Sequence, residues 1–147
     1  MSGIFSAFRI ATSALTGQRL RMDIIANNLD NAETTLTEEG GPYQKQTVVF
    51  QAAEGASPLP VNLPNRVREP ARGLRVTEII KDDSPGNRVY DPSHPDADEE
   101  GFVSYPNVNI VTEMTDMLSA TRSYEANVTV FNALNNMALR ALDIGRG

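Results

Sequence analysis

Apolar residues recur at alternating steps of four and three near both ends of the chain, but not in its middle. Such spacing puts an apolar row along one face of each of two long helices. We expect the two rows to pair as a coiled coil, leaving both flanks free for other subunits. The N-terminal row is Ile4, Phe8, Ala11, Leu15, Gln18, Met22, Ile25, Leu29 and Ala32. The C-terminal row is Ile110, Met114, Met117, Thr121, Tyr124, Val128, Phe131, Asn135, Ala138 and Leu142.

The C-terminal row changes direction along its length. After Phe131 the better apolar line is Leu134, Met137, Ala141 and Ile144. A straight helix of 3.6 residues per turn drifts away from a 3.5-residue repeat in this way. The second helix is therefore expected to have two contact faces.

The expected helix boundaries follow from residues that favour helix ends. The first helix spans residues 3–32 and ends in a segment rich in Asn and Asp. The second starts after Pro106, with Asn107 or Asn109 as its cap, and runs to about Ile144. Gly17 lies inside the first helix, either as a weak point costing about 1 kcal/mol or as a site where a neighbouring helix approaches closely.

The middle of the chain predicts a small β-hairpin unit over roughly 44–105. Residues 44–53 and 73–80 have strand character, 83–87 form a turn, and 88–90 form a short strand returning from it. The proline-rich segment 54–70 predicts a flexible or extended loop. The expected fold is mainly α with a small β insertion: terminal helices in 1–33 and 107–147, and a β-rich domain in 34–106.

Composition and charge exclude several classes of protein. The net charge of -6 is concentrated in residues 77–101, which hold eight acidic and two basic residues and no basic stripe for nucleic acid. The chain has no cysteine for a disulfide or thiolate site. No apolar run is long enough to span a membrane, and we expect no signal peptide before the first helix. The low aromatic share of 6% predicts limited stability for the isolated monomer.

One segment has a composition that could support catalysis. Residues 90–101 contain the sole histidine, His94, and five carboxylates. Pro92 and Pro95 interrupt the pattern of a calcium loop, and a hydrolytic metal site usually needs more than one histidine. We interpret the segment as a solvated acidic turn, with a small metal-dependent enzyme as an alternative. No phosphate loop, dinucleotide fingerprint or nucleophile elbow occurs, so we expect no enzyme and no cofactor.

Specific stretches carry a resemblance to a known family. Residues 13–29, SALTGQRLRMDIIANNL, resemble the N-terminal signature of bacterial flagellar rod, hook and hook-associated axial proteins. The stretches 40–43, 90–98, 105–114 and 122–127 are similar, within this family, to a rod protein of the basal body. Asp30 departs from the alanine that commonly follows Asn-Asn-Leu in the family.

The resemblance implies a structural subunit of the proximal rod, the drive shaft that transmits torque across the periplasm. It implies export by the flagellar type III apparatus without a cleaved signal. The implied partners are further copies and the rod proteins FlgB, FlgF and FlgG, with FliE at the base. A cytoplasmic helical adaptor or chaperone that binds a partner's amphipathic helix is the alternative.

The terminal helices are the expected assembly surface. We further expect one or both termini to be largely disordered before assembly and to fold on docking. The expected interface residues are Ile4, Phe8, Ala11, Leu15, Met22, Ile25, Leu29, Met114, Met117, Tyr124, Val128, Phe131, Leu134, Met137 and Ala141.

Overall fold

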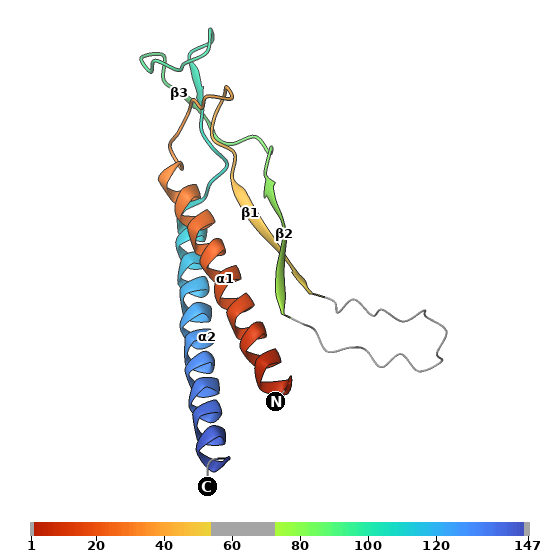
Figure 1. The fold of residues 1–147 in the computed structure, drawn as a ribbon. Coiled ribbons are helices and arrows are strands. Elements are labelled where there is room, and N and C mark those ends of the chain that lie inside the picture. The colour runs from red at the N-terminus through yellow and green to blue at the C-terminus, as the bar shows by residue number, and fades with distance from the viewer. Residues whose placement is uncertain (1, 54–72, 146–147) are drawn as a thin grey trace, which may run out of the picture.

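The computed structural model describes residues 2–53 and 73–145. Two long helices lie side by side, with small pairs of strands beside and beyond them (Figure 1). This arrangement confirms the expected mainly helical fold with a small β part. The predicted loop 54–70 lies outside the described residues. The elements are α1 (Ser2–Asp30), β1 (Gln46–Ala52), β2 (Leu74–Lys81), β3 (Arg88–Tyr90), β4 (Phe102–Ser104) and α2 (Ile110–Ile144).

The two helices pair, as the apolar rows predicted, and they run in antiparallel directions (Figure 1). The rings of Phe8 and Phe131 meet edge to face, with centroids 5.3 Å apart. Ala11 on α1 and Ala120 on α2 are both buried. At the far end of the pair, α2 continues past the start of α1 (Figure 1). Among the described residues, neither helix has an apolar stretch long enough to cross a membrane.

Local hydrogen bonds set the helix boundaries. The Asn109 side chain accepts a hydrogen bond from the Thr112 N–H at 3.0 Å and caps the start of α2. Of the two predicted caps, Asn109 therefore fills the position, while the Asn107 amide donates to Asp82. At the end of α1, the Asn31 amide donates to the Asn27 carbonyl, which ends the helix within the Asn-rich segment as expected.

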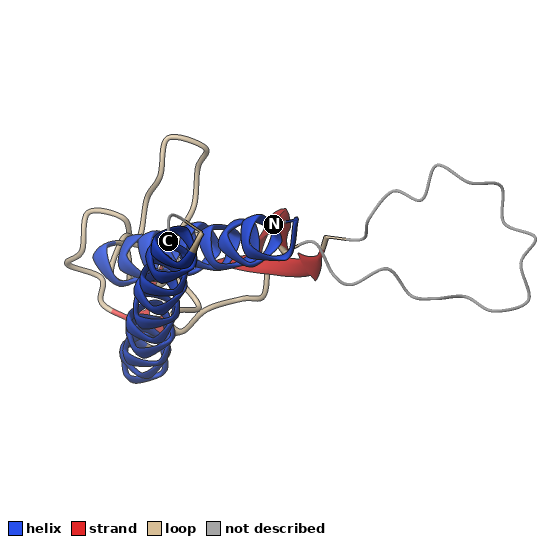
Figure 2. Ribbon diagram, turned by 60° about the horizontal axis from the view of Figure 1, so that its bottom comes forward, coloured by secondary structure: helices blue, strands red, loops and turns tan. Residues whose placement is uncertain are grey.

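Strands β1 and β2 form an antiparallel pair that lies along α1, on the side away from α2 (Figures 1 and 2). A Cβ atom on Gly17 would lie 2.6 Å from Leu74 Cδ2 and 3.2 Å from Phe50 Cε1. Of the two interpretations left open, close approach explains the glycine, but the neighbours are side chains of β1 and β2 and not of another helix. The Ser13 hydroxyl also accepts a hydrogen bond from the Leu74 N–H at 2.9 Å.

The predicted pairing of residues 88–90 was wrong. Strand β3 does not return along β2 but pairs with β4, which the sequence analysis did not identify. Tyr90 and Phe102 stack edge to face across this pair, and the Arg88 guanidinium lies 4.9 Å from the centre of the Phe102 ring. In the described part of the middle, the β1–β2 pair is thus an antiparallel hairpin as expected, while β3 and β4 form a second two-stranded sheet.

Candidate assembly surface and the polar cluster beside it

Most of the expected interface residues pack within the chain itself. On α1, Ala11 and Ile25 are buried, while the others are half-buried: Ile4, Phe8, Leu15, Met22 and Leu29. On α2, the half-buried members are Met117, Tyr124, Val128, Phe131 and Leu134. The remaining three, Met114, Met137 and Ala141, are exposed. The side chains chosen from the apolar rows thus mainly hold α1, α2 and the strands together.

Met114 is exposed because its neighbour takes the inward position. Glu113 is only 1% exposed, whereas Met114 is 60% exposed. In the first turns of α2 the inward position is therefore Glu113 and not the predicted Ile110 or Met114, and the inward line also includes the fully buried Ala120. The predicted line and the observed line coincide again from Met117 onward at several positions, since both follow helical spacing.

Exposed apolar side chains of α2 form a second apolar row in two parts, separated by the polar exposed residues between Leu118 and Val130. Its six members are each more than half exposed: Val111, Met114 and Leu118 near the start of α2, and Val130, Met137 and Ile144 in its second half. Residues 126–139 of the same helix contain no charged side chain. A long, exposed apolar row of this kind is typical of a surface that meets another protein.

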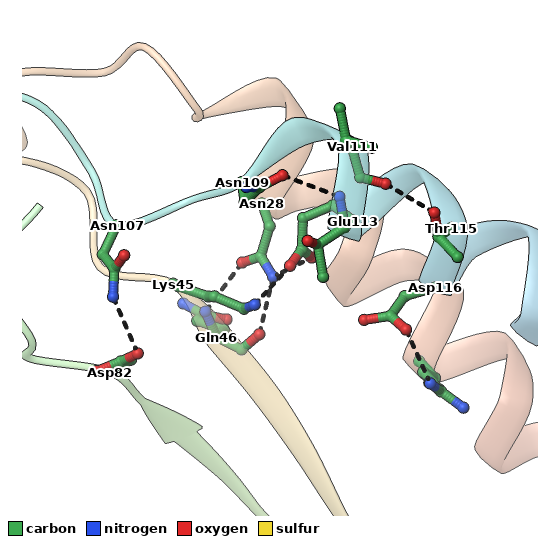
Figure 3. Close-up of polar contacts among 12 residues, drawn as sticks. Asn28, Lys45, Gln46, Asp82, Asn107, Asn109, Val111, Glu113, Thr115 and Asp116 are labelled. Carbon is green, nitrogen blue, oxygen red and sulfur yellow. Dashed lines mark hydrogen bonds and ion pairs between the residues drawn. The ribbon is translucent and has the colours of Figure 1, made fainter. Parts of the chain in front are cut away.

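A buried polar cluster lies where α1, α2 and the start of β1 meet (Figure 3). Asn28 is 1% exposed and uses both ends of its side-chain amide. Its Nδ2 donates to the Gln46 carbonyl at 2.8 Å and to Glu113 Oε2 at 3.0 Å. Its Oδ1 accepts from the Gln46 N–H at 2.9 Å and from the Tyr43 hydroxyl at 3.0 Å. One side chain on α1 therefore links three segments.

The carboxylate of Glu113 has a cationic partner from the segment that enters β1. Lys45 Nζ lies 2.6 Å from Glu113 Oε1, and the Lys45 side chain is 24% exposed. Burial raises the pKa of the nearby Tyr43 hydroxyl, and the negative charge of Glu113 raises it further. A weaker ion pair, Arg21–Asp116 at 3.7 Å, lies at the more exposed margin of the cluster.

Sequence reasoning missed this cluster. Asn28 was treated only as part of a helix end, and Glu113 was not singled out. A signal was nevertheless available, because Asn28 follows the buried Ile25 by three residues and Glu113 precedes the half-buried Met117 by four. Polar residues in line with an apolar row require internal partners once the row is buried.

The acidic segment 90–101 forms a turn held by its own carboxylates. Asp98 Oδ1 accepts hydrogen bonds from the Phe102 and Glu100 N–H groups, and its Oδ2 lies 2.6 Å from Arg88. The hydrogen bond from the Phe102 N–H is the largest cause of the lowered pKa of Asp98. In residues 2–53 and 73–145, no group of three metal-ligating side chains is placed to hold an ion. His94 Nδ1 accepts a hydrogen bond from the Asp96 N–H.

Comparison with known proteins supports the resemblance of both ends of the chain to flagellar axial proteins. Residues 8–35 match the family described as "Flagella basal body rod protein". Residues 99–144 match the family described as "Flagellar basal body rod FlgEFG protein C-terminal". Both matches fall mainly on the paired helices and the segment that precedes α2.

Curated relatives cover nearly the whole chain. The flagellar basal-body rod protein FlgC of Borreliella burgdorferi is 44% identical, with 99% of each chain covered. The proteins of the same name from Bacillus subtilis and Escherichia coli O157:H7 are 42% and 39% identical, with 97% of this chain and 98% of each relative covered. The chain therefore belongs to the FlgC family of flagellar basal-body rod proteins.

Proposed function

We propose that the chain is a structural subunit of the proximal rod of the flagellar basal body, where it helps to transmit torque across the periplasm. The observation that carries this proposal is the second apolar row of α2. After α2 has paired with α1, both parts of this row, residues 111–118 and 130–144, still carry exposed apolar side chains. In a family of rod proteins, such a row supports burial against neighbouring subunits.

The assembly contacts would be heterologous and would propagate as a helical tube, because α2 offers one face to α1 and a different face to its neighbours. The proposed partners are further copies of the chain and the rod proteins FlgB, FlgF and FlgG, with FliE at the base. Passage through the flagellar type III export apparatus without signal cleavage completes the proposal. The role is structural, and we propose no catalytic activity and no cofactor.

The test separates the second apolar row from the residues that hold the chain together. Ile25 is 5% exposed, so a charge there would disrupt the helix pair itself. Leu118 is 54% exposed, so Leu118→Glu should leave the packing of α2 on α1 unchanged but prevent burial of this position in a rod. Asn135→Glu is the matched control, since Asn135 is exposed on α2 but is not a member of the second apolar row.

Each variant would replace the wild-type gene in a flagellated bacterium. We expect Leu118→Glu to abolish swimming and to leave basal bodies without complete rods in electron micrographs, while Asn135→Glu swims normally. Normal rods with Leu118→Glu and also with Met137→Glu would refute the assignment of the row. Complete rotating filaments in cells that lack the chain would refute the rod function itself.

A further inference from the structure

We propose that the buried carboxylate of Glu113 makes the pairing of α2 with α1 conditional on the docking of the segment that enters β1. This inference concerns the chain itself and does not depend on its role in the rod. Glu113 lies on the face of α2 that packs against α1, and its side chain is 2% exposed. Any pairing of the two helices in this register therefore removes its carboxylate from water.

The partners that balance this charge do not all belong to the helices. On α1, the Asn28 amide reaches Glu113 Oε2, but Oε1 is paired with Lys45 Nζ at 2.6 Å. Lys45 directly precedes β1, and the next residue, Gln46, holds Asn28 by hydrogen bonds in both directions. If this segment were not docked, the helices could pair only by burying a carboxylate without its cation, which is strongly unfavourable.

The two members of the ion pair are not equivalent. Lys45 is 24% exposed and carries its charge on a long, flexible stem, so its ammonium group can reach water when Glu113 is absent. Glu113 has no such route, because it is held in the interface between the helices. Loss of the Lys45 cation should therefore weaken the pairing of α2 with α1 more than loss of the Glu113 carboxylate does.

The consequence is an order of docking within one chain. The segment around Lys45 must lie against Asn28 before α2 can bury Glu113 at acceptable cost. Strands β1 and β2 are held against α1 separately, through Ser13 and Gly17. The C-terminal helix thus docks last, on a surface already completed by α1 and β1, and an α1 without its docked strand is a poor partner for α2.

The chain has no cysteine, so pairs of spin labels can be introduced at chosen exposed sites. Thr12→Cys with Asn132→Cys reports the separation of α1 and α2, and Thr16→Cys with Thr47→Cys reports docking of β1 on α1. Pulsed electron spin resonance at a fixed, partly denaturing urea concentration gives the ratio of paired to separated helices in the full-length chain.

We expect Lys45→Met to lower the ratio of paired to separated helices by roughly a hundredfold. Adding Glu113→Gln to Lys45→Met should restore the ratio to within about tenfold of the parent, because the buried charge is gone while an acceptor for Asn28 remains. Lys81→Met is the matched control and should change nothing measurable, since Lys81 pairs with Glu39 on the exposed surface.

Two results would overturn the proposal. The first is a ratio of paired to separated helices that stays within about threefold of the parent in Lys45→Met, since burying a charge without its partner should destabilise the pair by much more than that. The second is a double variant that falls as far as Lys45→Met alone, which would mean that Lys45 acts by packing and not by balancing Glu113. If Lys45→Met proves too unstable to label, the double variant alone still decides. Only the charge argument predicts that its ratio of paired to separated helices lies within about tenfold of the parent.

Discussion

Replacing Asn28 by alanine is the most direct test of the polar cluster as a stabilising link. The substitution removes a side-chain amide that makes four hydrogen bonds in a site that is 1% exposed. Two of these bonds are to the backbone of Gln46, one is to Glu113 and one is from Tyr43. Alanine leaves every one of these partners in place without its bond.

The expected cost follows from the bonds lost. A net contribution of about 1 kcal/mol applies to each neutral hydrogen bond, and about 1.5–3 kcal/mol to one with a charged group. The three neutral bonds and the one charged bond sum to about 4.5–6 kcal/mol, and water entering the vacated space recovers part of this free energy. Helix propensity also favours alanine over asparagine by several tenths of a kcal/mol. We therefore expect Asn28→Ala to lower the free energy of unfolding by about 3 kcal/mol.

The measurement is urea unfolding of the purified full-length chain, followed by circular dichroism. A loss of about 3 kcal/mol corresponds to a fall of roughly 6–12 °C in Tm for a chain of this size. Asn27→Ala is the matched control, because Asn27 is the exposed neighbour and its side chain accepts a single hydrogen bond, from Asn31. We expect this control to stay within about 0.5 kcal/mol of the parent.

The reasoning fails if Asn28→Ala is no less stable than Asn27→Ala. Such a result would mean that the amide contributes no more than a solvent-exposed one, and that the cluster does not hold α1, α2 and β1 together. Asn28→Asp gives an independent check, because it keeps the shape and Oδ1 but places a second carboxylate beside Glu113. It should be at least as destabilising as alanine at neutral pH.

Three further predictions follow from the packing and the charges. Gly17→Ala should lower the free energy of unfolding by about 1–3 kcal/mol, because the added Cβ would press on the β1–β2 pair. Gly3→Ala is the control and should not lower it, because there is open space around Gly3. Thermal unfolding of the two variants tests the difference. Phe131→Ala should cost about 3 kcal/mol by removing the ring that packs on Phe8, and urea titration tests this. The pKa of Asp98 is lowered in the folded chain, so the ionised carboxylate stabilises the fold. This stabilisation is fully present above the unfolded-state pKa of about 3.9 and is lost as the pH falls through the folded-state pKa. Unfolding measured between about pH 5 and pH 2.5 should thus show a shallower loss of stability in Asp98→Asn than in the parent.

The helices could be predicted because the signals that form them are local. The spacing of apolar residues and the cap at Asn109 lie within a few residues of the structure they determine. The predicted first helix, 3–32, and the observed one, Ser2–Asp30, differ only at their ends. The pairing of the two helices also followed, since two apolar rows of similar length in one chain can bury each other.

Strand pairing was less predictable because it depends on contacts between distant residues. The turn signal at 83–87 suggested that residues 88–90 return along β2. Instead the Asn87 carbonyl accepts a hydrogen bond from Tyr105, and β3 pairs with a strand of only three residues, too short to show alternation. The return is made possible by Gly101, with φ +84, and by the Asp98 side chain that accepts from Phe102.

The apolar rows expected from the sequence mainly pack within the chain, whereas the second apolar row of α2 remains exposed. Helix α1 lies between α2 and the β1–β2 pair, so it is covered on two sides (Figure 1). Among the described residues, helix α2 is covered by α1 on one side only, and its second apolar row remains exposed. Since burial of apolar area drives association, contacts between subunits should depend more on α2 than on α1. An apolar spacing rule cannot separate these two uses, because a residue buried within the chain and one buried between subunits produce the same pattern.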